Sequence, residues 1–274
     1  MPTTTKPNVR TFSATHHFAG VARHYRGLRD LDGRTARRVG QMLADLARPN
    51  VQLRVLDGGA GTGRYTEAVV ATVVADHGLG CTAVACDANQ RMLASTAAPP
   101  SDTEGQMTRV VGLVEALPLR DGAFDAVLSF NAVHHFDLDG FLAAAAMVLR
   151  PEGLLTVYTR TPEQNRRTVW GELFPHFADR ETRLLTQEDL QSAVASRAEF
   201  DLVTVEAVPW TLQTTAARLV TQATGRYYST FGFYTPEEFQ AALSTFEARL
   251  AEHYSDLSNV VWQNDHLLLV ARRR

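Results

Sequence analysis

One stretch, residues 55–64, limits the possible folds of this chain more than any other part of its sequence. A strand of mostly apolar residues, predicted over 51–57, ends in Asp57 and leads into a turn with glycine at every second position. These glycines are Gly59, Gly61 and Gly63. Glycine permits a sharp turn with positive φ, and a ligand can approach its backbone closely because there is no Cβ. The helix predicted over 64–75 directs unpaired N–H groups and the positive end of its dipole to the same place, so the sequence predicts a ligand site there.

The spacing of these glycines distinguishes between classes of ligand. A dinucleotide fingerprint, Gly-x-Gly-x-x-Gly, needs its third glycine where this chain has Arg64, which argues against a nicotinamide or flavin enzyme. The stretch resembles the first motif of the class I S-adenosylmethionine-dependent methyltransferases, hydrophobic-hydrophobic-(Asp/Glu)-x-Gly-x-Gly-x-Gly. The resemblance implies S-adenosyl-L-methionine as the cofactor and S-adenosyl-L-homocysteine as its product. It also implies a site for the methionyl part, formed by Asp57, Gly58, Gly59, Gly61 and Gly63.

A second predicted strand, 82–86, ends in Asp87. An acidic residue at this position binds ribose hydroxyls in nucleotide-binding α/β folds, and the methyltransferases share the feature. Asp87, with Ala88 beside it, is therefore the expected ribose ligand. The alternative is that Asp87 only caps the helix predicted over 88–97.

A third predicted strand, 109–114, leads into residues 115–125, which resemble the "GDAExLPFxDxSFD" stretch of the methyltransferases of ubiquinone and menaquinone biosynthesis. The resemblance implies that the adenine lies beside Glu115, Ala116 and Leu117. The aspartate that usually holds the adenine amine in that group falls here on Leu113. Adenine recognition must then depend on backbone groups, on Glu115 or on packing.

The order of the elements predicts the fold class. Short apolar strands alternate with helices of ten or more residues, which is typical of an α/β, doubly wound, Rossmann-like sheet. Further strands are predicted at 126–130, 154–158 and 200–209, and over 260–271 or part of it, giving seven in all. The resemblance implies that they are mostly parallel, with strand 7 antiparallel.

The end of the fourth strand carries the candidate catalytic residues, Asn131 and the pair His134 and His135. Parallel sheets bind ligands at the carboxyl ends of their strands, so Asn131 and His134 should border the transferred methyl group. Histidine titrates near neutral pH, and either ring could act as a general base. Alternatively, both rings only pack or bond backbone groups. Methyl transfer does not require a base, because positioning and exclusion of water supply much of the acceleration.

The chain divides into a short tail and one domain. Residues 1–10 are rich in Thr, Pro and Lys and are predicted to be disordered, while 11–274 form a single methyltransferase domain. Its parts are N-terminal cap helices (11–50), a cofactor-binding core (51–160) and two helical insertions that form a substrate lid (160–199 and 211–258).

Several residues outside the core are candidates for substrate contact, each with a simpler alternative. Tyr25 is close to the active site by resemblance, or is a packing residue. Arg160 could hold an acidic group of the substrate, or lie on a solvated helix face. The aromatic residues either line the substrate pocket or pack within the lid. They are Trp170, Tyr227, Tyr228 and Phe231.

Composition excludes other classes of function. The formal charge is −3, from 27 basic and 30 acidic residues, so no strong positive field attracts nucleic acid. No apolar run approaches the roughly 18 residues of a membrane span. Cys81 and Cys86 should lie on opposite faces of one strand and cannot pair, which indicates a reduced, cytoplasmic protein. The histidines lack the spacing of a metal site.

These observations predict an S-adenosylmethionine-dependent transferase that methylates a small, apolar or aromatic molecule, in small-molecule or secondary metabolism. The acceptor atom (O, N, S or C) and the oligomeric state remain open. The alternatives are a protein or tRNA methyltransferase and an S-adenosylmethionine-binding protein that does not methylate.

Overall fold

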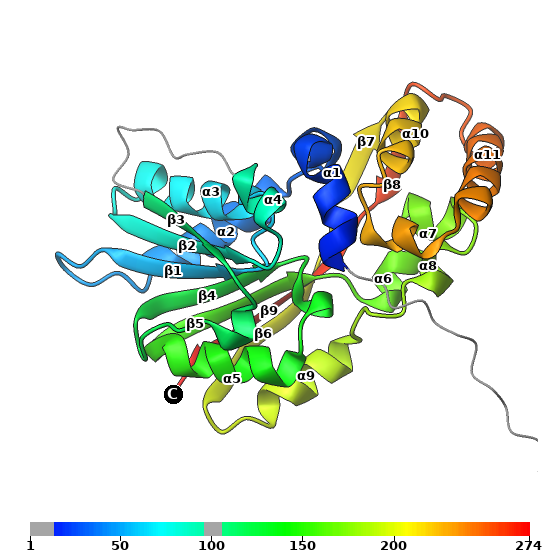
Figure 1. Ribbon diagram of the computed structural model, residues 1–274. Coiled ribbons are helices and arrows are strands. Elements are labelled where there is room, and N and C mark those ends of the chain that lie inside the picture. Colours follow the sequence, from blue (N-terminus) through cyan, green and yellow to red (C-terminus); the bar gives the residue numbers. More distant parts are fainter. Residues whose placement is uncertain (1–13, 96–105) are drawn as a thin grey trace, which may run out of the picture.

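A seven-stranded mixed sheet lies at the centre of the molecule, in the order β3-β2-β1-β4-β5-β9-β6 (Figure 1). The computed structural model describes residues 14–95 and 106–274, so the tail 1–10 lies outside the described residues. The strands are β1 (Leu53–Gly58), β2 (Cys81–Asp87), β3 (Gln106–Val111), β4 (Phe124–Phe130), β5 (Leu149–Thr159), β6 (Phe200–Val208) and β9 (His266–Arg273). Neighbouring strands are parallel except that β9 runs antiparallel between β5 and β6. The predicted doubly wound sheet with an antiparallel last strand is confirmed.

Helices cover both faces of this sheet (Figure 1). On one face lie α2 (Gly33–Ala44), α3 (Arg64–Ala71) and a π-helical turn, η1 (Thr72–Asp76); on the other lie α5 (Leu138–Val148) and α9 (Gln187–Ala195). Successive strand residues point to opposite faces. Val55 therefore belongs to the apolar core beneath α2 and α3, and Leu56 to the core beneath α5 and α9. Cys81 and Cys86 are free thiols in these two opposite cores, as predicted.

The remaining elements form a second unit beside one end of the sheet (Figure 1). They are α6 (Pro162–Arg166), α7 (Val169–Leu173), α8 (Phe177–Arg180), β7 (Thr211–Thr214), α10 (Ala216–Thr224), η4 (Ser229–Phe233), α11 (Pro236–His253) and β8 (Val260–Gln263). Their buried rings pack into one core, which we call the aromatic cluster: Trp170, Phe174, Phe177, Tyr227, Phe231, Tyr234, Phe239, Phe246 and Trp262. Helix α1 (Ala14–Leu28) contacts both α4 (Gln90–Ala94), beside the sheet, and η4 of this unit.

Two boundaries near the expected site differ from prediction. Strand β3 ends at Val111, three residues early, because its register with β2 places Val111 opposite the terminal Asp87. The chain then turns at Gly112, and the predicted end of the strand forms a 3-10 turn instead, η2 (Val114–Ala116). Helix α4 begins at Gln90 with Asn89 as its N-cap, two residues later than predicted.

The insertions also differ in extent from prediction. The last strand of the main sheet, predicted over 260–271 or part of it, is β9 alone, since β8 pairs with β7 in a separate two-stranded sheet. Helix α9 lies within the expected lid segment 160–199, but its Leu190 and Val194 pack into the core of the sheet. Apolar periodicity locates these elements without showing which core they join, since the same apolar face suits either.

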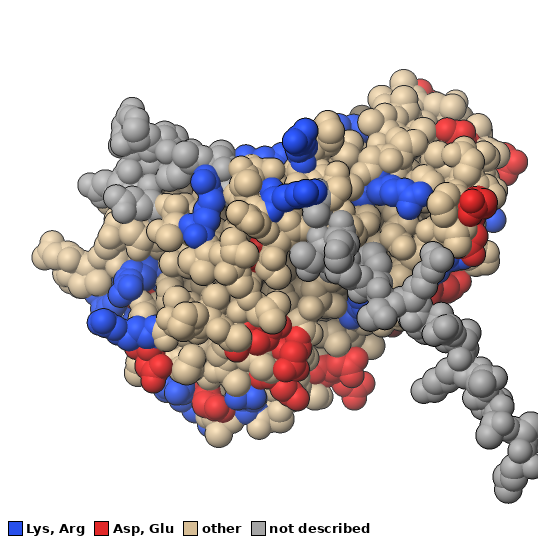
Figure 2. All heavy atoms as spheres, in the orientation of Figure 1, with Lys and Arg blue, Asp and Glu red and all other residues tan. Residues whose placement is uncertain are grey.

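The surface view shows how charge is distributed on one side of the molecule. Figure 2 shows acidic side chains gathered over α5 and α9 and along α11, with basic side chains scattered elsewhere on this face. No helix in the described part of the chain is both long and apolar enough to cross a bilayer.

A buried carboxylate joins the strands at the end of the sheet away from the glycine turn. Asp125, near the start of β4, is 2% exposed and accepts hydrogen bonds from the backbone N–H of Arg54 (2.8 Å) and from Nη2 of Arg48 (3.1 Å). The Nε group of Arg150, which precedes the tight turn in β5, donates to the same carboxylate. Asp125 thus ties β1, β4 and β5 together.

We expect Asp125→Ala to lower the free energy of unfolding by about 3 kcal/mol, because it leaves the partly buried Arg150 without its partner. Affinity for the ligand of the glycine turn should not change, since the length of β4 separates the two by roughly 20 Å. Urea denaturation and calorimetric titration measure the two effects. Asp201→Ala, which removes an exposed partner of Arg274, is the control and should have little effect. A large loss of ligand affinity in Asp125→Ala would contradict the assignment.

Candidate functional site

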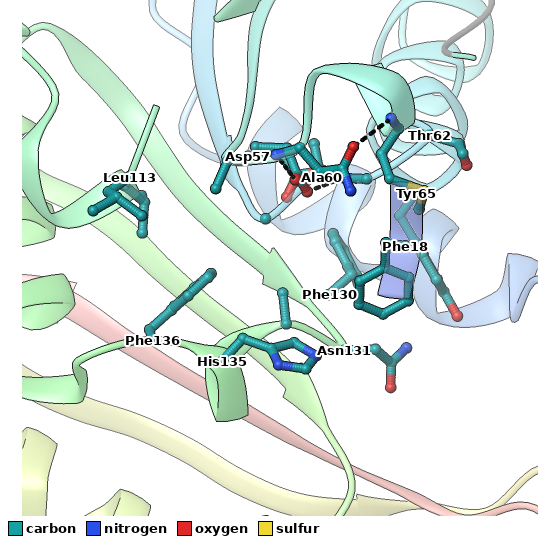
Figure 3. A pocket seen from close by; sticks show the side chains of 18 of the residues that line it. Phe18, Asp57, Ala60, Thr62, Tyr65, Leu113, Phe130, Asn131, His135 and Phe136 are labelled. Atoms are coloured by element: carbon teal, nitrogen blue, oxygen red, sulfur yellow. Dashed lines mark hydrogen bonds between the residues drawn. The ribbon is translucent and has the colours of Figure 1, made fainter. Parts of the chain in front are cut away.

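A cavity of about 190 Å³ opens where β1, β2 and β4 end. The turn after β1 forms one wall, and Figure 3 shows Asp57 and Ala60 on this side, with Leu113, Phe136 and His135 across the cavity. Phe18 of α1 covers it from a third side, so the N-terminal helix contributes to the pocket.

The glycine turn has the backbone that the sequence predicts. Gly59, Gly61 and Gly63 have φ angles of 71°, 58° and 69°. Gly59 is also confined by its neighbours, since a Cβ there would lie 2.4 Å from Cβ of Ala132 and 2.8 Å from the ring of Phe136. Gly63 is the N-cap residue of α3 and uses the left-handed conformation to start that helix.

Asp57 lies at the base of the cavity and is 1% exposed. Its Oδ2 accepts a hydrogen bond from the hydroxyl of Thr66, whereas its Oδ1 has no partner among the described residues. Oγ1 of Thr62, in the same wall, is also buried without a partner. Burial raises the pKa of Asp57 to about 7, Thr66 opposes the shift, and the charge of Asp87 adds to it. Buried polar atoms that lack partners point to a polar ligand group at this position.

Asp87 fixes the shape of the turn from the end of β2. Its Oδ2 accepts from the N–H of Gly61 (2.8 Å), and its Oδ1 from the N–H of Asn89 (2.7 Å). Burial raises the pKa of Asp87, and these two backbone donors oppose the shift. Asn89, not Asp87, caps α4, so the alternative role weighed for Asp87 is not the one observed. Asp87 and Ala88 both line the cavity.

The region expected to hold adenine is only partly as predicted. Glu115 lines the cavity; its Oε1 accepts from the N–H of Asp137 (3.1 Å), and its Oε2 has no partner among the described residues. Ala116 and Leu117 do not line it, since Leu117 belongs to the core of the sheet. Leu113 is 61% exposed and borders the cavity, where it offers an apolar surface to a flat ring.

Asn131 is the central residue of the site. It follows β4 with φ of 55°, a conformation that asparagine tolerates better than most residues, and its N–H donates to the carbonyl of Tyr158 (2.6 Å). It lines the main cavity and also two smaller ones, of about 20 and 40 Å³, on the side of the aromatic cluster. Backbone strain of this kind is often found at functional sites.

The two histidines lie beside Asn131 and are neutral at physiological pH. Burial lowers the pKa of His134 to about 3 and that of His135 to about 2, and the nearby Arg183 lowers both further. Nδ1 of His135 lies 3.4 Å from Nη1 of Arg183, and Nδ1 of His134 is buried without a partner in the described structure. Such weakly basic rings favour a packing or hydrogen-bonding role over general-base catalysis.

The candidate substrate residues fall into three groups. Tyr25, His134, Arg160 and Tyr228 line the 40 Å³ cavity, and His135 lines it too. Trp170 and Tyr227 belong to the aromatic cluster and border the 20 Å³ cavity. Phe231 is fully buried in the aromatic cluster and lines none of these three cavities. The predicted Gly58 and Gly63 likewise shape the turn without lining the main cavity.

Other residues of the site were not predicted from the sequence. Tyr65 stacks on Phe130 with ring centroids 4.5 Å apart, and both line the main cavity. Arg29, at the end of α1, borders both smaller cavities. The position of Tyr65, directly after the glycine turn, could have signalled its role, but nothing near Arg29 in the sequence does so.

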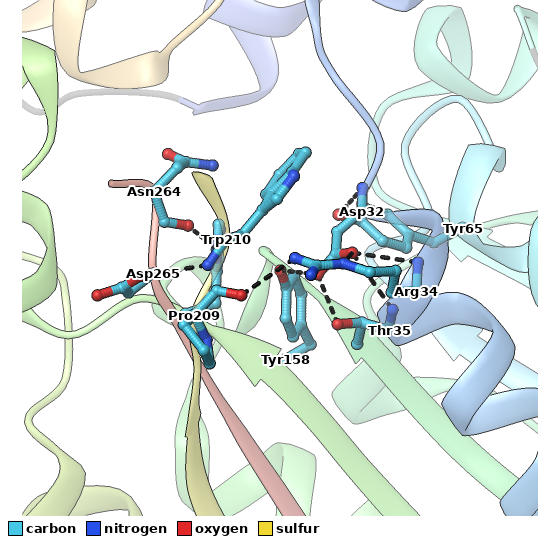
Figure 4. A network of polar contacts seen from close by, with 10 residues as sticks. Asp32, Arg34, Thr35, Tyr65, Tyr158, Pro209, Trp210, Asn264 and Asp265 are labelled. Carbon is cyan, nitrogen blue, oxygen red and sulfur yellow. Dashed lines mark hydrogen bonds and ion pairs between the residues drawn. The ribbon is translucent and has the colours of Figure 1, made fainter. Parts of the chain in front are cut away.

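A buried network supports this wall of the site (Figure 4). The hydroxyl of Tyr158 donates to Oδ2 of Asp32 (3.1 Å), and the N–H of Asp32 donates to the hydroxyl of Tyr65 (3.3 Å). Asp32 also caps α2 through the N–H groups of Arg34 and Thr35. The network joins the N-terminal helices to β5 and to the helix after the glycine turn.

Comparisons with known proteins agree with this geometry. The methyltransferase domain family matches residues 56–157. An uncharacterized methyltransferase of Mycobacterium tuberculosis is 31% identical over 185 residues, which cover 66% of this chain and 67% of that protein. The chain belongs to the class I S-adenosylmethionine-dependent methyltransferases. The cofactor of this methyltransferase is S-adenosylmethionine, as the sequence predicted.

Solved structures resemble the methyltransferase in fold. Loganic acid methyltransferase with S-adenosylhomocysteine has a TM-score of 0.62 and 14% identity, and the match covers 100% of this chain and 99% of that one. The 4+2 cyclase SpnF has a TM-score of 0.55 and 17% identity, with 94% and 95% covered. In the described part of the methyltransferase, no group of three or more His, Cys, Asp or Glu could hold a metal ion.

Gly59→Ala tests the close contact at the turn. We expect it to lower the free energy of unfolding by about 3 kcal/mol or more, through left-handed strain and overlap with Ala132, and to abolish S-adenosylhomocysteine binding. Gly78→Ala is a matched control, because Gly78 has φ of 65° but no atom within 4 Å of its Cβ position. The control should lose about 1–2 kcal/mol and keep its affinity. Equal effects of the two substitutions on binding would refute the role of the contact.

Asp57→Asn tests the buried carboxylate. Because the pKa of Asp57 is raised in the folded state, its ionisation destabilises the ligand-free protein increasingly as pH rises from about 4 to 7. The variant should therefore melt at a higher temperature than the wild type, by a margin that grows up to pH 7 and is constant above it.

The same substitution should weaken S-adenosylhomocysteine binding about tenfold or more at pH 8, where the carboxylate can pair with an ammonium group. Wild-type affinity should fall as pH drops below 7, and the affinity of the variant should not. Calorimetric titration at pH 6 and 8 measures both. A pH dependence that survives in Asp57→Asn would assign it to another group.

Proposed function

We propose that this chain transfers the methyl group of S-adenosylmethionine to a small molecule held between the end of the sheet and the helical unit beside it. The observation that supports this most directly is the arrangement of the cavities. The cofactor cavity adjoins two smaller cavities at Asn131, and residues around these come from α1, the end of β5 and the aromatic cluster.

The cofactor fits the residues of the main cavity. Oδ1 of Asp57 and Oγ1 of Thr62 lack partners and would bind the polar methionyl end. Asp87 would accept the ribose hydroxyls, and Leu113 with Met92 would enclose the adenine. When bound there, S-adenosylmethionine supplies an electrophilic methyl group on its sulfonium sulfur.

The protein's own contribution is to position the acceptor and exclude water. Phe18, Tyr25 and His135 line both the cofactor cavity and the 40 Å³ cavity, so they stand at the boundary between the two ligands. Holding the reacting atoms in line about 3 Å apart accounts for much of the acceleration that methyl transfer requires. A proton lost by the acceptor would pass to water or to a neighbouring polar group, because His134 and His135 are weak bases.

The small size of these cavities and the aromatic side chains around them favour a small acceptor with an apolar or aromatic body. Trp170, Trp210 and Trp262 border the 20 Å³ cavity. A solved relative in fold is named for a small acid, loganic acid. We place the protein among the small-molecule methyltransferases, which include the ubiquinone and menaquinone group that its sequence resembles. We assign the segments 160–180 and 211–263 as its substrate lid.

Two alternatives to a small-molecule methyltransferase are a protein or tRNA methyltransferase and a protein that binds the cofactor without methylating. A protein or tRNA acceptor would need the lid to open fully, which the paired insertions and their common core disfavour. A chain of this fold need not methylate, since one solved structure of similar fold, SpnF, is named as a 4+2 cyclase. The two buried free thiols suit a reducing, cytoplasmic location.

Thermal melting with S-adenosylmethionine, S-adenosylhomocysteine and NAD in parallel tests the proposal. A ligand at 100 times its dissociation constant adds about 2.7 kcal/mol, so the two adenosyl compounds should raise the melting temperature by several degrees and NAD should not. Incubation of the protein with S-adenosylmethionine and small-molecule fractions should then yield S-adenosylhomocysteine. If the protein binds S-adenosylmethionine but converts it only when a protein or tRNA fraction is added, and not with small-molecule fractions, a protein or tRNA acceptor would be favoured.

A further inference from the structure

The half-buried Arg29 and the buried Arg160 flank one tyrosine ring beyond Asn131. The guanidinium carbon of Arg29 lies 4.5 Å from the ring centroid of Tyr228, and that of Arg160 lies 5.8 Å from it. Nη1 of Arg160 also donates to the hydroxyl of Tyr228 (3.1 Å). These residues come from three separate segments, the end of α1, the end of β5 and the start of η4, so the tertiary structure alone brings them together.

Neither guanidinium has a carboxylate partner within the described chain. Arg160 is 6% exposed, its other neighbours are the neutral side chains of Asn264 and His266, and its Nε has no partner among the described residues. Burial and the nearby positive charges keep the pKa of His266 well below its usual value, so this ring does not balance the charge.

The acidic residues that border the same cavities are already paired. Glu181 is held by Arg183 and by the hydroxyl of Thr230, and Asp30 by Arg218 (3.2 Å). The two guanidiniums, one buried and one half-buried, are therefore in excess of the carboxylates around them. Buried charges without partners are costly, and proteins retain them mainly where a ligand completes the site.

Tyr228 reports the resulting positive potential. Burial would raise the pKa of its hydroxyl, but the charges of Arg160 and Arg29 outweigh burial and lower the pKa to about 8. The position therefore stabilises a negative charge.

We propose that Arg29 and Arg160 form an anion-binding subsite that holds a carboxylate group of the methyl acceptor beside Tyr228. This inference rests on the proposed function and narrows its substrate class to small acids with an apolar or aromatic body. The 40 Å³ cavity that both arginines border has room for a group of about the size of a carboxylate, since one water needs roughly 10–15 Å³ measured in this way.

The surrounding contacts explain why each arginine suits this role. Oδ1 of Asn264 accepts a hydrogen bond from Nη2 of Arg160 (2.5 Å). Figure 4 shows Asn264 beside Trp210, and the backbone N–H of Asn264 donates to the carbonyl of Trp210. Arg160 is thus fixed in position, while Arg29 is held by stacking on Tyr228 and Tyr227. A planar guanidinium can bind a carboxylate through two parallel hydrogen bonds.

Arg64 links the cofactor side to this arrangement. It lines the main cavity and, with Arg29 and Arg160, the 20 Å³ cavity, and it donates to the backbone carbonyls of Arg29 and Asp30. Arg29 and Arg160 do not line the main cavity, so substitution of Arg29 tests the acceptor side without removing a residue that lines the cofactor cavity.

The experiment uses the full chain saturated with S-adenosylhomocysteine and two pairs of isosteric probes, benzoate with benzamide and phenylacetate with phenylacetamide. The two carboxylates should raise the melting temperature saturably and perturb the tryptophan fluorescence, and the amides should not.

Arg29→Gln should weaken carboxylate binding at least about tenfold, with S-adenosylhomocysteine affinity unchanged within about twofold. Arg29→Lys, which keeps the charge but not the planar fork, should give an intermediate loss. Arg167→Gln, at an exposed arginine outside these cavities, is the control and should bind as the wild type.

The outcomes are separable. If neither carboxylate binds the wild type in preference to its amide, or if Arg29→Gln binds both carboxylates normally, the anion subsite is refuted while the proposed methyltransferase function stands. If the wild type fails to bind S-adenosylhomocysteine at all, the proposed function itself fails. A loss of stability in Arg29→Gln with undiminished carboxylate binding would show that Arg29 only packs on the tyrosines.

Discussion

The site depends on one close contact, between the glycine turn after β1 and the residues after β4. Gly59 lies so near Ala132 and Phe136 that no Cβ fits between them. This contact sets the turn beside Asn131, where the cofactor cavity adjoins the smaller cavities. The parallel sheet supplies the framework, because it ends β1, β2 and β4 at the same edge, and the glycines allow the connecting loops to meet there.

Charge is distributed over this framework at a cost to the stability of the ligand-free protein. At the cofactor end, the carboxylate of Asp57 is buried with one oxygen unpaired. At the other end, Arg160 is buried and Arg29 is half-buried, and no carboxylates balance them. Opposite charges thus stand at the two ends of one connected site, as a zwitterionic methionyl group and an acidic acceptor would require. The aromatic cluster and the network around Asp32 hold these groups in position, so packing elsewhere offsets the free energy lost by burying the charges.

The cofactor site was largely predictable because its signals are local. The turn, Asp57 and Asp87 are marked by their positions at the ends of apolar strands, and all of them lie at the cavity. Errors arose where pairing between strands sets the boundary, as at the early end of β3, or where one apolar run serves two cores, as at β8 and β9. Leu117 was placed in the site by resemblance and Phe231 by its aromatic ring, but burial puts both in apolar cores.

The sequence by itself determined the fold class, the cofactor and the residues of the glycine turn, because positive φ angles and strand-to-helix turns are properties of neighbouring residues. Only the tertiary structure decided what the acceptor side can recognise. Arg29, Arg160 and Tyr228 lie far apart in the chain, and each is ordinary in its own segment. Their proximity gives them a function, because the energy of a charge removed from water depends on every group packed around it and not on its neighbours in sequence.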